Sequence, residues 1–501
     1  MSVFSRIKHA NPAAKSSVAY TICNVIQKSI SFLTLPLFTR LLTTTQYGQY
    51  TIYTTWSAIF TILITLNLSF GTFDKAMVKY EDEKNKYVSS IHFLVFAISI
   101  LFLAIYLPLS NFINEFVSLP TPIMLLMVGE IVCCFAVQTW CSKEKFEYHW
   151  KGVVLVTLLI AFLAPLSGLV LVLNFRDNAG YARIYGYAIV NIVVGLFFII
   201  YNIAKGRVTF SKKFWKYALS FNIPLIPYYF SQIIFNQSDR IMIEKLQSVE
   251  EAGIYGVAYS LALLLMFVVT SINSAYVPWL YRKIRDKGHR ANWKISILIL
   301  CIVSVLIMFV IWIAPEAMLI IAPEDYQGAV NVVPPVALSL VLLLLSQYSI
   351  NIQFYYEQKW RLVFASILSA GLNIGLNFWL IPIYGYVAAG YTTLISYIVF
   401  ALCNYLCIID KVKKGGELHG IFNFWLLCLI FLGFAGLSYA GVLLYSNRIL
   451  RLSIFVAMIV LTTVFAVIFR KKIMVLIHKL SNKEKEEPAQ VVEEGKVNES
   501  N

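Results

Sequence analysis

The chain has 501 residues, of which 59% are hydrophobic and only 13% are charged, and its mean hydropathy is +0.73. This composition is typical of a polytopic membrane protein and excludes a soluble catalytic domain. The net charge of +15 raises the alternative of nucleic-acid binding. That function needs a folded basic surface, however, and the basic residues here lie in loops between apolar runs.

Apolar runs long enough to cross the roughly 30 Å hydrocarbon core of a bilayer predict about 14 transmembrane helices. Most of the 41 Lys and Arg residues fall in the N-terminal segment, the alternate loops that follow it and the C-terminal tail. The positive-inside rule therefore places both termini in the cytoplasm. The predicted spans are 16–39, 48–70, 91–113, 121–141, 152–174, 183–203, 218–240, 252–275, 295–314, 331–356, 361–381, 386–409, 421–445 and 449–470.

The first predicted span contains a lysine, Lys28, roughly 18 Å along the helix at 1.5 Å per residue and so near the bilayer centre. A lysine at this depth costs about 2.5–3.5 kcal/mol on insertion scales. Its polar neighbours Asn24, Gln27 and Ser31 share its part of the helix surface. Two interpretations stay open: Lys28 is a cavity cation that awaits an anionic group, or it pairs with Glu130 in the fourth span.

The seventh span carries a polar stripe that is expected on one helical face. Because unpaired amides cost several kcal/mol in hydrocarbon, this face must turn toward other helices or a water-filled cavity. Towards the predicted outer end, Asp239 and Arg240 either cap the helix and pair locally, or act as a gate or cation-linked carboxylate. The stripe consists of Asn222, Tyr229, Gln232, Asn236 and Asp239, of which Tyr229, Gln232 and Asn236 are candidate cavity residues.

Two weaker signals concern the same region. Pro224 and Pro227 each remove a helical hydrogen bond and predict a kink that could serve as a hinge. In the eleventh span, Asn373 and Asn377 have the spacing to face a cavity, but such amides also join membrane helices to one another. Neither alternative is favoured by spacing alone.

The two halves of the chain resemble each other, which predicts an internal duplication. Six spans per repeat keep both halves in the same orientation, as parallel repeats. Two stretches of sequence recur, and we call each recurrence an echo. The main echo, at a shift of 205 residues, aligns Leu41 with Leu246, Gly48 with Gly253 and Tyr50 with Tyr255. The second echo, at a shift of 199 residues, aligns Ile184–Tyr187 with Ile383–Tyr386.

The duplication divides the chain into four predicted parts. Residues 1–205 form an N-terminal lobe with spans 1–6, and residues 206–412 form a C-terminal lobe with spans 7–12. Residues 413–475 carry two further spans. Residues 476–501 form a charged, aromatic-free tail whose composition is typical of disorder.

The chain lacks the signals of a catalytic or metal site. It has no Walker, GxSxG, HExxH or DxD motif, and its eight cysteines include no CxxC pair. All six histidines lie at or beyond the predicted cytoplasmic helix ends, which argues against a metal site at mid-membrane. We expect no enzyme activity, no catalytic residue, no metal and no cofactor.

Several short motifs resemble those of the polysaccharide transporter family, the Wzx-type oligosaccharide flippases. This family shares a superfamily with the multidrug and toxin extruders (MATE proteins) and the lipid II flippases. The resemblance in layout covers residues 10–475, although Glu244 and Gln247 stand where the family often has glycine. The motifs are Asn236–Arg240 (NQSDR), Gly253–Tyr255, Ala258 with Tyr259, Pro382–Gly385 (PIYG) and Ala388 with Ala389.

The resemblance implies an all-α, MATE-like fold with two six-helix lobes around a central cavity, two extra C-terminal helices and alternating access. It implies that the protein moves an undecaprenyl-diphosphate-linked oligosaccharide from the inner to the outer leaflet of the bacterial plasma membrane, for O-antigen or capsule export. A buried cation suits a diphosphate. Membrane lipids and the polysaccharide polymerase machinery are further candidate partners. The alternatives are a cation-coupled drug antiporter of the same fold and, in another class, a membrane glycan polymerase.

Overall fold

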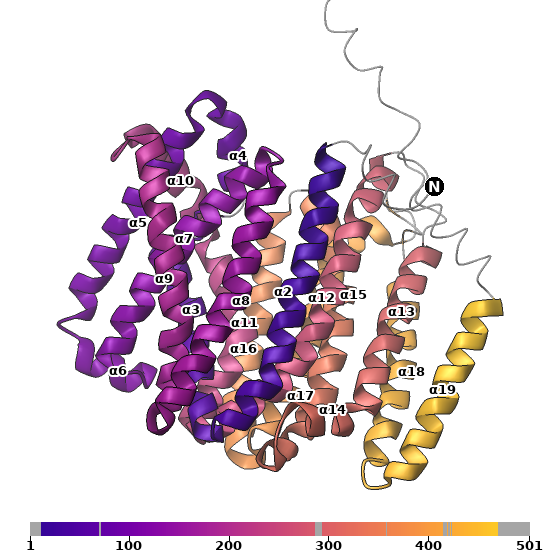
Figure 1. Cartoon of the computed structure of the whole chain (residues 1–501). Helices are drawn as coiled ribbons and strands as arrows, with labels where there is room; N and C mark the ends of the chain where they lie inside the picture. Colours follow the sequence, from indigo (N-terminus) through magenta and orange to yellow (C-terminus); the bar gives the residue numbers. More distant parts are fainter. Residues whose placement is uncertain are drawn as a thin grey trace, which may run out of the picture.

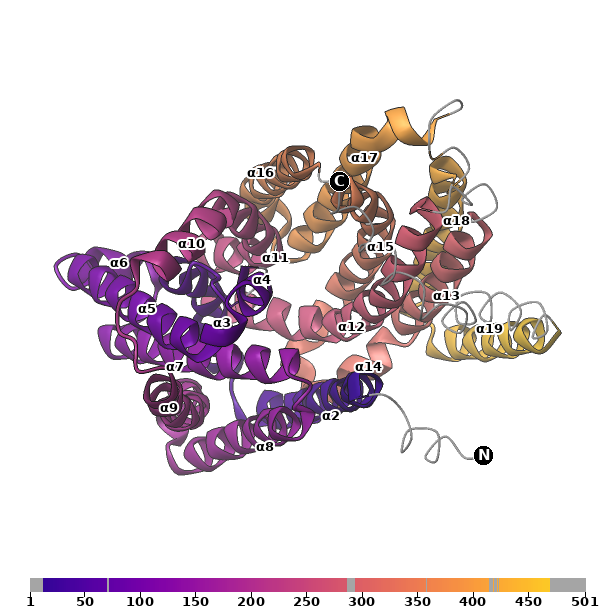
Figure 2. The same cartoon turned by 90° about the horizontal axis from the view of Figure 1, so that it is seen from above.

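A computed structural model describes residues 12–69, 72–285, 293–356, 358–413, 418, 421 and 423–468. Every regular element in these ranges is a helix, and the long helices run side by side as one bundle (Figure 1). Seen from above, α2 and α8 lie at one edge of the bundle and α16 and α17 at the opposite edge (Figure 2). The predicted tail, 476–501, lies outside the described residues.

The helices divide at residue 206 into two series. The first consists of α2 (Pro12–Leu41), α3 (Thr44–Thr65), α4 (Thr72–Lys79), η1 (Glu81–Glu83), α5 (Lys84–Tyr106), α6 (Ser110–Val117), α7 (Thr121–Phe146), α8 (Trp150–Asn174), η2 (Arg176–Asn178) and α9 (Ala179–Gly206). The second consists of α10 (Lys212–Asn222), η3 (Ile223–Leu225), α11 (Ile226–Leu246), α12 (Val249–Arg285), α13 (Trp293–Trp312), α14 (Ala314–Ile321), η5 (Glu324–Val332), α15 (Val333–Tyr355), α16 (Lys359–Tyr384), α17 (Val387–Val412), α18 (Phe424–Leu443) and α19 (Arg448–Ile468).

Each predicted span overlaps at least one of these helices. Among the described residues, ten helices are long and apolar enough to cross a membrane, or eleven if bent α12 is taken as one span. Helices α3, α11 and α19 fall outside this set. The count of about 14 spans therefore stays a prediction.

The predicted kink in the seventh span is confirmed. The chain leaves α10 at Asn222, passes through η3 and starts α11 at Ile226. Pro224 lies in η3, and Pro227 lies in the first turn of α11, where a missing N–H breaks no hydrogen bond. The two prolines thus split the span into separate helices.

Helices at the same place in each series make the same contacts. In the first series α9 packs on α7 and α8, and α2 packs on α8. In the second series α17 packs on α15 and α16, and α11 packs on α16. Helix α18 packs on α13 and α15, and α19 lies at the periphery beside α13 (Figure 2).

The main echo aligns equivalent points of the two series. Helix α2 ends at Leu41 and α11 ends at Leu246, and each is followed by a short turn into α3 or α12. The second echo does not align equivalent points: Ile184–Tyr187 lies inside α9, whereas Ile383–Tyr386 covers the end of α16 and the turn before α17. The shift of the second echo is close to that of the main echo, but this similarity is confined to the sequence and does not correspond to equivalent positions in the structure.

The two series meet where α3 and α12 begin. The backbones approach so closely that a Cβ atom added to Gly48 would lie 2.0 Å from the Val249 carbonyl oxygen. In the same region Thr44 Oγ1 donates a hydrogen bond to Glu250 Oε1 at 3.0 Å, and Lys245 Nζ donates one to Ser118 Oγ at 2.8 Å. We call this region the glycine end of the bundle.

Candidate functional site

A cavity of about 390 Å³ lies between α2, α3, α8 and α9. The side towards α8 is apolar and includes Ala161 and Ala164, whereas α2 and α9 contribute polar groups. Ser260 of α12 is the one lining residue from the second series. The cavity thus belongs almost entirely to the first series of helices.

Three of the predicted residues on the first span line this cavity: Gln27, Lys28 and Ser31. The Lys28 side chain is exposed, and it has no ion-pair partner in the described part of the chain. Asn24 is exposed on α2 but does not line the cavity. The structure therefore places a free ammonium group on α2 at a polar cavity.

Glu130 does not neutralise this lysine. Its Oε1 accepts a hydrogen bond from Asn191 Nδ2 at 2.6 Å, and its Oε2 accepts one from the hydroxyl of Tyr53. Asn191 lines the cavity, so Glu130 lies one side chain away from it. The alternative in which Lys28 forms a buried pair with Glu130 does not describe this structure.

Arg183, the first residue of the sixth predicted span, also lines the cavity. Arg183 lies within α9, because the helix begins at Ala179, one turn before the predicted span. Its side chain is only 5% exposed. Its place at the start of an apolar run does not distinguish it from a basic residue that marks a helix end, so the sequence alone does not predict a cavity residue there.

Four aromatic rings surround the Arg183 guanidinium, and we call this group the aromatic cage. The guanidinium carbon lies 3.6 Å from the ring centre of Tyr50 and 4.1 Å from that of Phe38. The rings of Tyr47 and Tyr187 lie at 5.0 and 5.8 Å. These distances are those of cation–π contacts, which hold a charge in place without neutralising it.

The polar stripe of the seventh span does not reach this cavity. Gln232 Nε2 donates a hydrogen bond to Ser366 Oγ at 3.1 Å, and Asn236 Oδ1 accepts one from the Tyr397 hydroxyl at 3.4 Å. Both partners belong to α16 or α17. Tyr229 is half-buried on α11 and does not line the cavity either. The hydrogen bonds of Gln232 and Asn236 therefore run to helices of the second series, whereas Tyr229 interacts with Asn67 of the first series.

Asp239 is the centre of a buried polar network at the end of this stripe. The carboxylate is 2% exposed and accepts hydrogen bonds from the Tyr255 hydroxyl at 2.8 Å and from Asn377 Nδ2 and Thr393 Oγ1, both at 2.6 Å. Arg240 turns away, with its guanidinium carbon 4.3 Å from the ring centre of Tyr259. The expected local pair between Asp239 and Arg240 is absent among the described ion pairs.

Asn373 and Asn377 join α16 to its neighbours. Both side chains are fully buried, and Ser238 Oγ donates to Asn373 Oδ1 at 2.9 Å. Asn377 binds Asp239 and accepts a hydrogen bond from Thr392. Of the two interpretations left open for these amides, helix-to-helix bonding matches their contacts.

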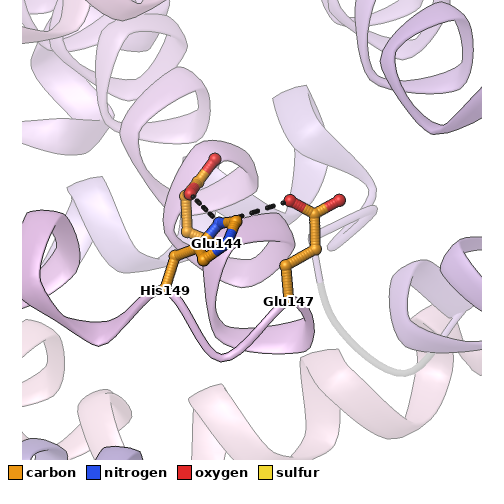
Figure 3. A group of neighbouring side chains, drawn as sticks. All are labelled: Glu144, Glu147 and His149. Carbon is orange, nitrogen blue, oxygen red and sulfur yellow. Dashed lines mark hydrogen bonds and ion pairs between the residues drawn. The ribbon is translucent and has the colours of Figure 1, made fainter.

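A further charged cluster lies between α7 and α8 (Figure 3). His149 Nδ1 lies 3.0 Å from Glu144 Oε2 and 3.6 Å from Glu147 Oε2. Each carboxylate also has a lysine nearby, with Lys143 Nζ 3.5 Å from Glu144 Oε1 and Lys84 Nζ 3.7 Å from Glu147 Oε1. Two ammonium groups beside the carboxylates would repel a metal ion, so this cluster is an ion-pair network.

Residues 13–284, more than half of the chain, match the family described as polysaccharide biosynthesis protein. The chain belongs to this family. It is 24% identical over 380 residues to Lsg locus protein 1 of Haemophilus influenzae, covering 71% of this chain and 88% of that protein. It is 25% identical over 389 residues to an uncharacterized membrane protein of the same organism, covering 72% and 88%.

Solved structures show the same fold. The chain is similar to the lipid II flippase MurJ in an inward closed conformation, with a TM-score of 0.67 and 14% identity, over 91% of this chain and 100% of that chain. It is also similar to an inward-facing multidrug resistance MATE family transporter, with a TM-score of 0.60 and 11% identity, over 78% and 97%. The predicted MATE-like, all-helical fold is confirmed.

The family and the fold together indicate the general class of protein to which this chain belongs. The protein belongs to the polysaccharide biosynthesis protein family and has the long apolar helices of a multi-pass membrane protein. The two solved structures that share its fold are a flippase and a transporter rather than enzymes.

Proposed function

We propose that the protein is a flippase that moves an undecaprenyl-diphosphate-linked oligosaccharide from the inner to the outer leaflet of the bacterial plasma membrane. The observation that carries this proposal is the exposed Lys28 on a membrane helix at a polar cavity, where no described residue forms an ion pair with it. A cation at that depth is costly unless a ligand or water compensates it. A diphosphate is a ligand of the required charge.

The size of the cavity indicates which part of the substrate it holds. About 390 Å³ is the volume of a pocket for a small ligand. It suits the diphosphate and the first sugar, with Gln27, Ser31 and the tyrosines of the aromatic cage as hydrogen-bonding and stacking groups. The rest of the glycan requires a wider state, which alternating access would supply.

Alternating access requires two units that move against each other, and we propose the two helix series as those units. The contacts of α9, α8 and α2 recur in α17, α16 and α11, which supports two six-helix lobes. The proposed boundaries near residues 205 and 412 coincide with the ends of α9 and α17, and residues 413–475 add α18 and α19. Both termini are proposed to be cytoplasmic.

The residues around Asp239 are proposed to serve coupling rather than substrate contact. Asp239 is a buried carboxylate surrounded by hydroxyl and amide groups, and Arg240 and Glu130 are further candidates for a gate or ion-coupling role. The proposed role of Tyr229, Gln232 and Asn236 in lining the passage requires a state in which α11 separates from α16 and α17.

The test is reconstitution of the purified full chain in liposomes that contain a defined undecaprenyl-diphosphate-linked oligosaccharide. Exchange between leaflets is scored with and without Na⁺ or proton gradients, for the wild type, Lys28→Ala and a control, Lys151→Ala, at an exposed lysine on α8. We expect transport by the wild type and the control and a loss of about tenfold or more for Lys28→Ala. Export of cationic drugs without glycan transport would instead support an antiporter.

A second arm tests the proposed partners. Co-purification with the polysaccharide polymerase machinery from bacterial plasma membranes would support assembly with it. Transport by the isolated chain in liposomes would show that the polymerase is not required for the flipping step.

A further inference from the structure

Arg183 is a buried cation with no counter-charge. It is 5% exposed, and no carboxylate pairs with it in the described ranges. Its guanidinium interacts with the hydroxyls of Tyr47 and Tyr187, yet Nε and Nη1 have no hydrogen-bond partner. Unsatisfied donors on a buried charged group are costly, so a protein retains them where a ligand supplies the acceptors.

The position of the guanidinium shows where that ligand would lie. Arg183 lines the same cavity as Lys28, and α2 and α9 bring the two side chains to it from different parts of the chain. The nearest carboxylate partner of the lining residues, Glu130, is bound by Tyr53 and Asn191. The cavity therefore holds two cations, and no acid within the described ranges pairs with either of them.

The two cations differ in how they are held. Lys28 is exposed on a flexible four-carbon chain, whereas the aromatic cage fixes the plane of the Arg183 guanidinium, with Tyr50 and Phe38 closest. A fixed guanidinium loses less entropy when it binds oxyanions, and its planar donors match phosphate geometry. Arg183 has the properties of a specificity-determining contact, and Lys28 those of an adaptable one.

We propose that Arg183 is the principal anion-binding residue of this protein, and that its aromatic cage positions it for the diphosphate of a lipid-linked substrate. The proposal rests on the function proposed above, but it adds a residue and a geometry. In this proposal, Arg183 on α9 and the aromatic cage select the diphosphate headgroup, and Lys28 makes the second contact with it.

The experiment measures thermal stabilisation of the detergent-purified full chain by inorganic pyrophosphate and, separately, by undecaprenyl diphosphate. The variants are Arg183→Gln, Arg183→Lys and a control, Arg176→Gln, at an exposed arginine in the turn before α9. We expect both ligands to stabilise the wild type and the control, with an apparent affinity about tenfold or more lower in Arg183→Gln. Arg183→Lys should be intermediate, because it keeps the charge and loses the planar stacking.

A structural role for Arg183 makes a different prediction. If the guanidinium only holds the cage together, Arg183→Gln lowers the melting temperature of the ligand-free protein and leaves the response to pyrophosphate intact. Under our proposal the response to pyrophosphate falls whatever the melting temperature of the ligand-free variant, because the guanidinium supplies the contacts to the anion. If Arg183→Gln does not fold, an unchanged pyrophosphate affinity in Arg183→Lys overturns the proposal.

The same variants separate this proposal from the proposed function. If pyrophosphate stabilises the protein in an Arg183-dependent way but the protein moves no lipid-linked oligosaccharide, the anion site is supported and the flippase function is contradicted. If Arg183→Gln transports at the wild-type rate with unchanged ligand affinity, the anion site is contradicted and the flippase function is supported. Absence of any response to either ligand in the wild type also overturns the anion site.

Discussion

Gly48 and Gly253 face each other where α3 and α12 begin. A Cβ atom added to Gly253 would lie 2.8 Å from the backbone nitrogen of Gly48 and 2.5 Å from the carbonyl oxygen of Thr44. A Cβ atom added to Gly48 would meet Val249 instead. The shift of 205 residues that aligns Gly48 with Gly253 also aligns Thr44 with Val249, so the contact is nearly the same from either side, as at a twofold axis.

This reciprocity yields the first prediction. Gly48→Ala should lower the free energy of unfolding by about 1–3 kcal/mol, because the methyl group would overlap the Val249 carbonyl and force the helices apart. The matched control is Gly371→Ala in α16, where a Cβ atom would contact nothing within 4 Å. Thermal unfolding of both variants in detergent measures the difference. Equal melting temperatures would show that the two helices can separate freely.

A second prediction concerns the polar network of α11. Asp239→Asn replaces two acceptor oxygens by one, so at least one of the donors Tyr255, Asn377 and Thr393 loses its partner. We expect a loss of about 1–3 kcal/mol in unfolding free energy. The control is Asp410→Asn, at an exposed ion pair with Arg361.

The same variant tests the proposed coupling role. If the Asp239 carboxylate links transport to an ion gradient, Asp239→Asn should fold and bind the lipid-linked substrate but lose the dependence of its transport on that gradient. The measurement is leaflet exchange in liposomes with and without the gradient. Retained gradient dependence would restrict Asp239 to a structural role.

A third prediction concerns the attachment of the last two helices. Arg451 of α19 is 1% exposed and donates a hydrogen bond to Glu316 of α14. Glu316→Gln would leave the buried guanidinium without its counter-charge, at an expected cost of about 3 kcal/mol. Arg448→Gln, which removes only the exposed partner 3.4 Å from Glu316, should cost less than about 1 kcal/mol. Chemical denaturation in detergent distinguishes the two.

A fourth prediction concerns topology. Single cysteines placed in the 207–211 and 445–447 connections of a cysteine-free variant should be labelled from opposite sides of the membrane, with the first accessible from the cytoplasm. Thiol labelling of intact cells with an impermeant reagent measures this. Labelling of both positions from one side would contradict the prediction of about 14 spans and the placement of both termini in the cytoplasm.

Much of the fold follows from short-range rules that the sequence displays. Apolar runs mark the helices, and prolines at 224 and 227 mark the break before α11. The turn that follows Leu41 is repeated after Leu246 because both sequences end one helix and start the next with the same spacing. Each of these features depends on residues close together in the chain.

The site depends on contacts between distant residues, and there the sequence is less informative. A polar stripe shows that a face avoids lipid, but it does not show which helix that face meets. The stripe of α11 meets α16 and α17, whereas Lys28 meets a cavity. Arg183 is not among the candidate residues predicted from the sequence, because nothing local reveals that Phe38, Tyr47, Tyr50 and Tyr187 gather around it.

The cavity is walled by one series of helices, apart from Ser260, while the Asp239 network lies wholly within the other. If the proposed roles are correct, this division lets the two halves specialise independently. Substitutions that change the choice of substrate would then accumulate before residue 206 and leave the Asp239 network unchanged. Related chains that carry different glycans should then differ most in their first halves, and exchanging that half alone should transfer the preference.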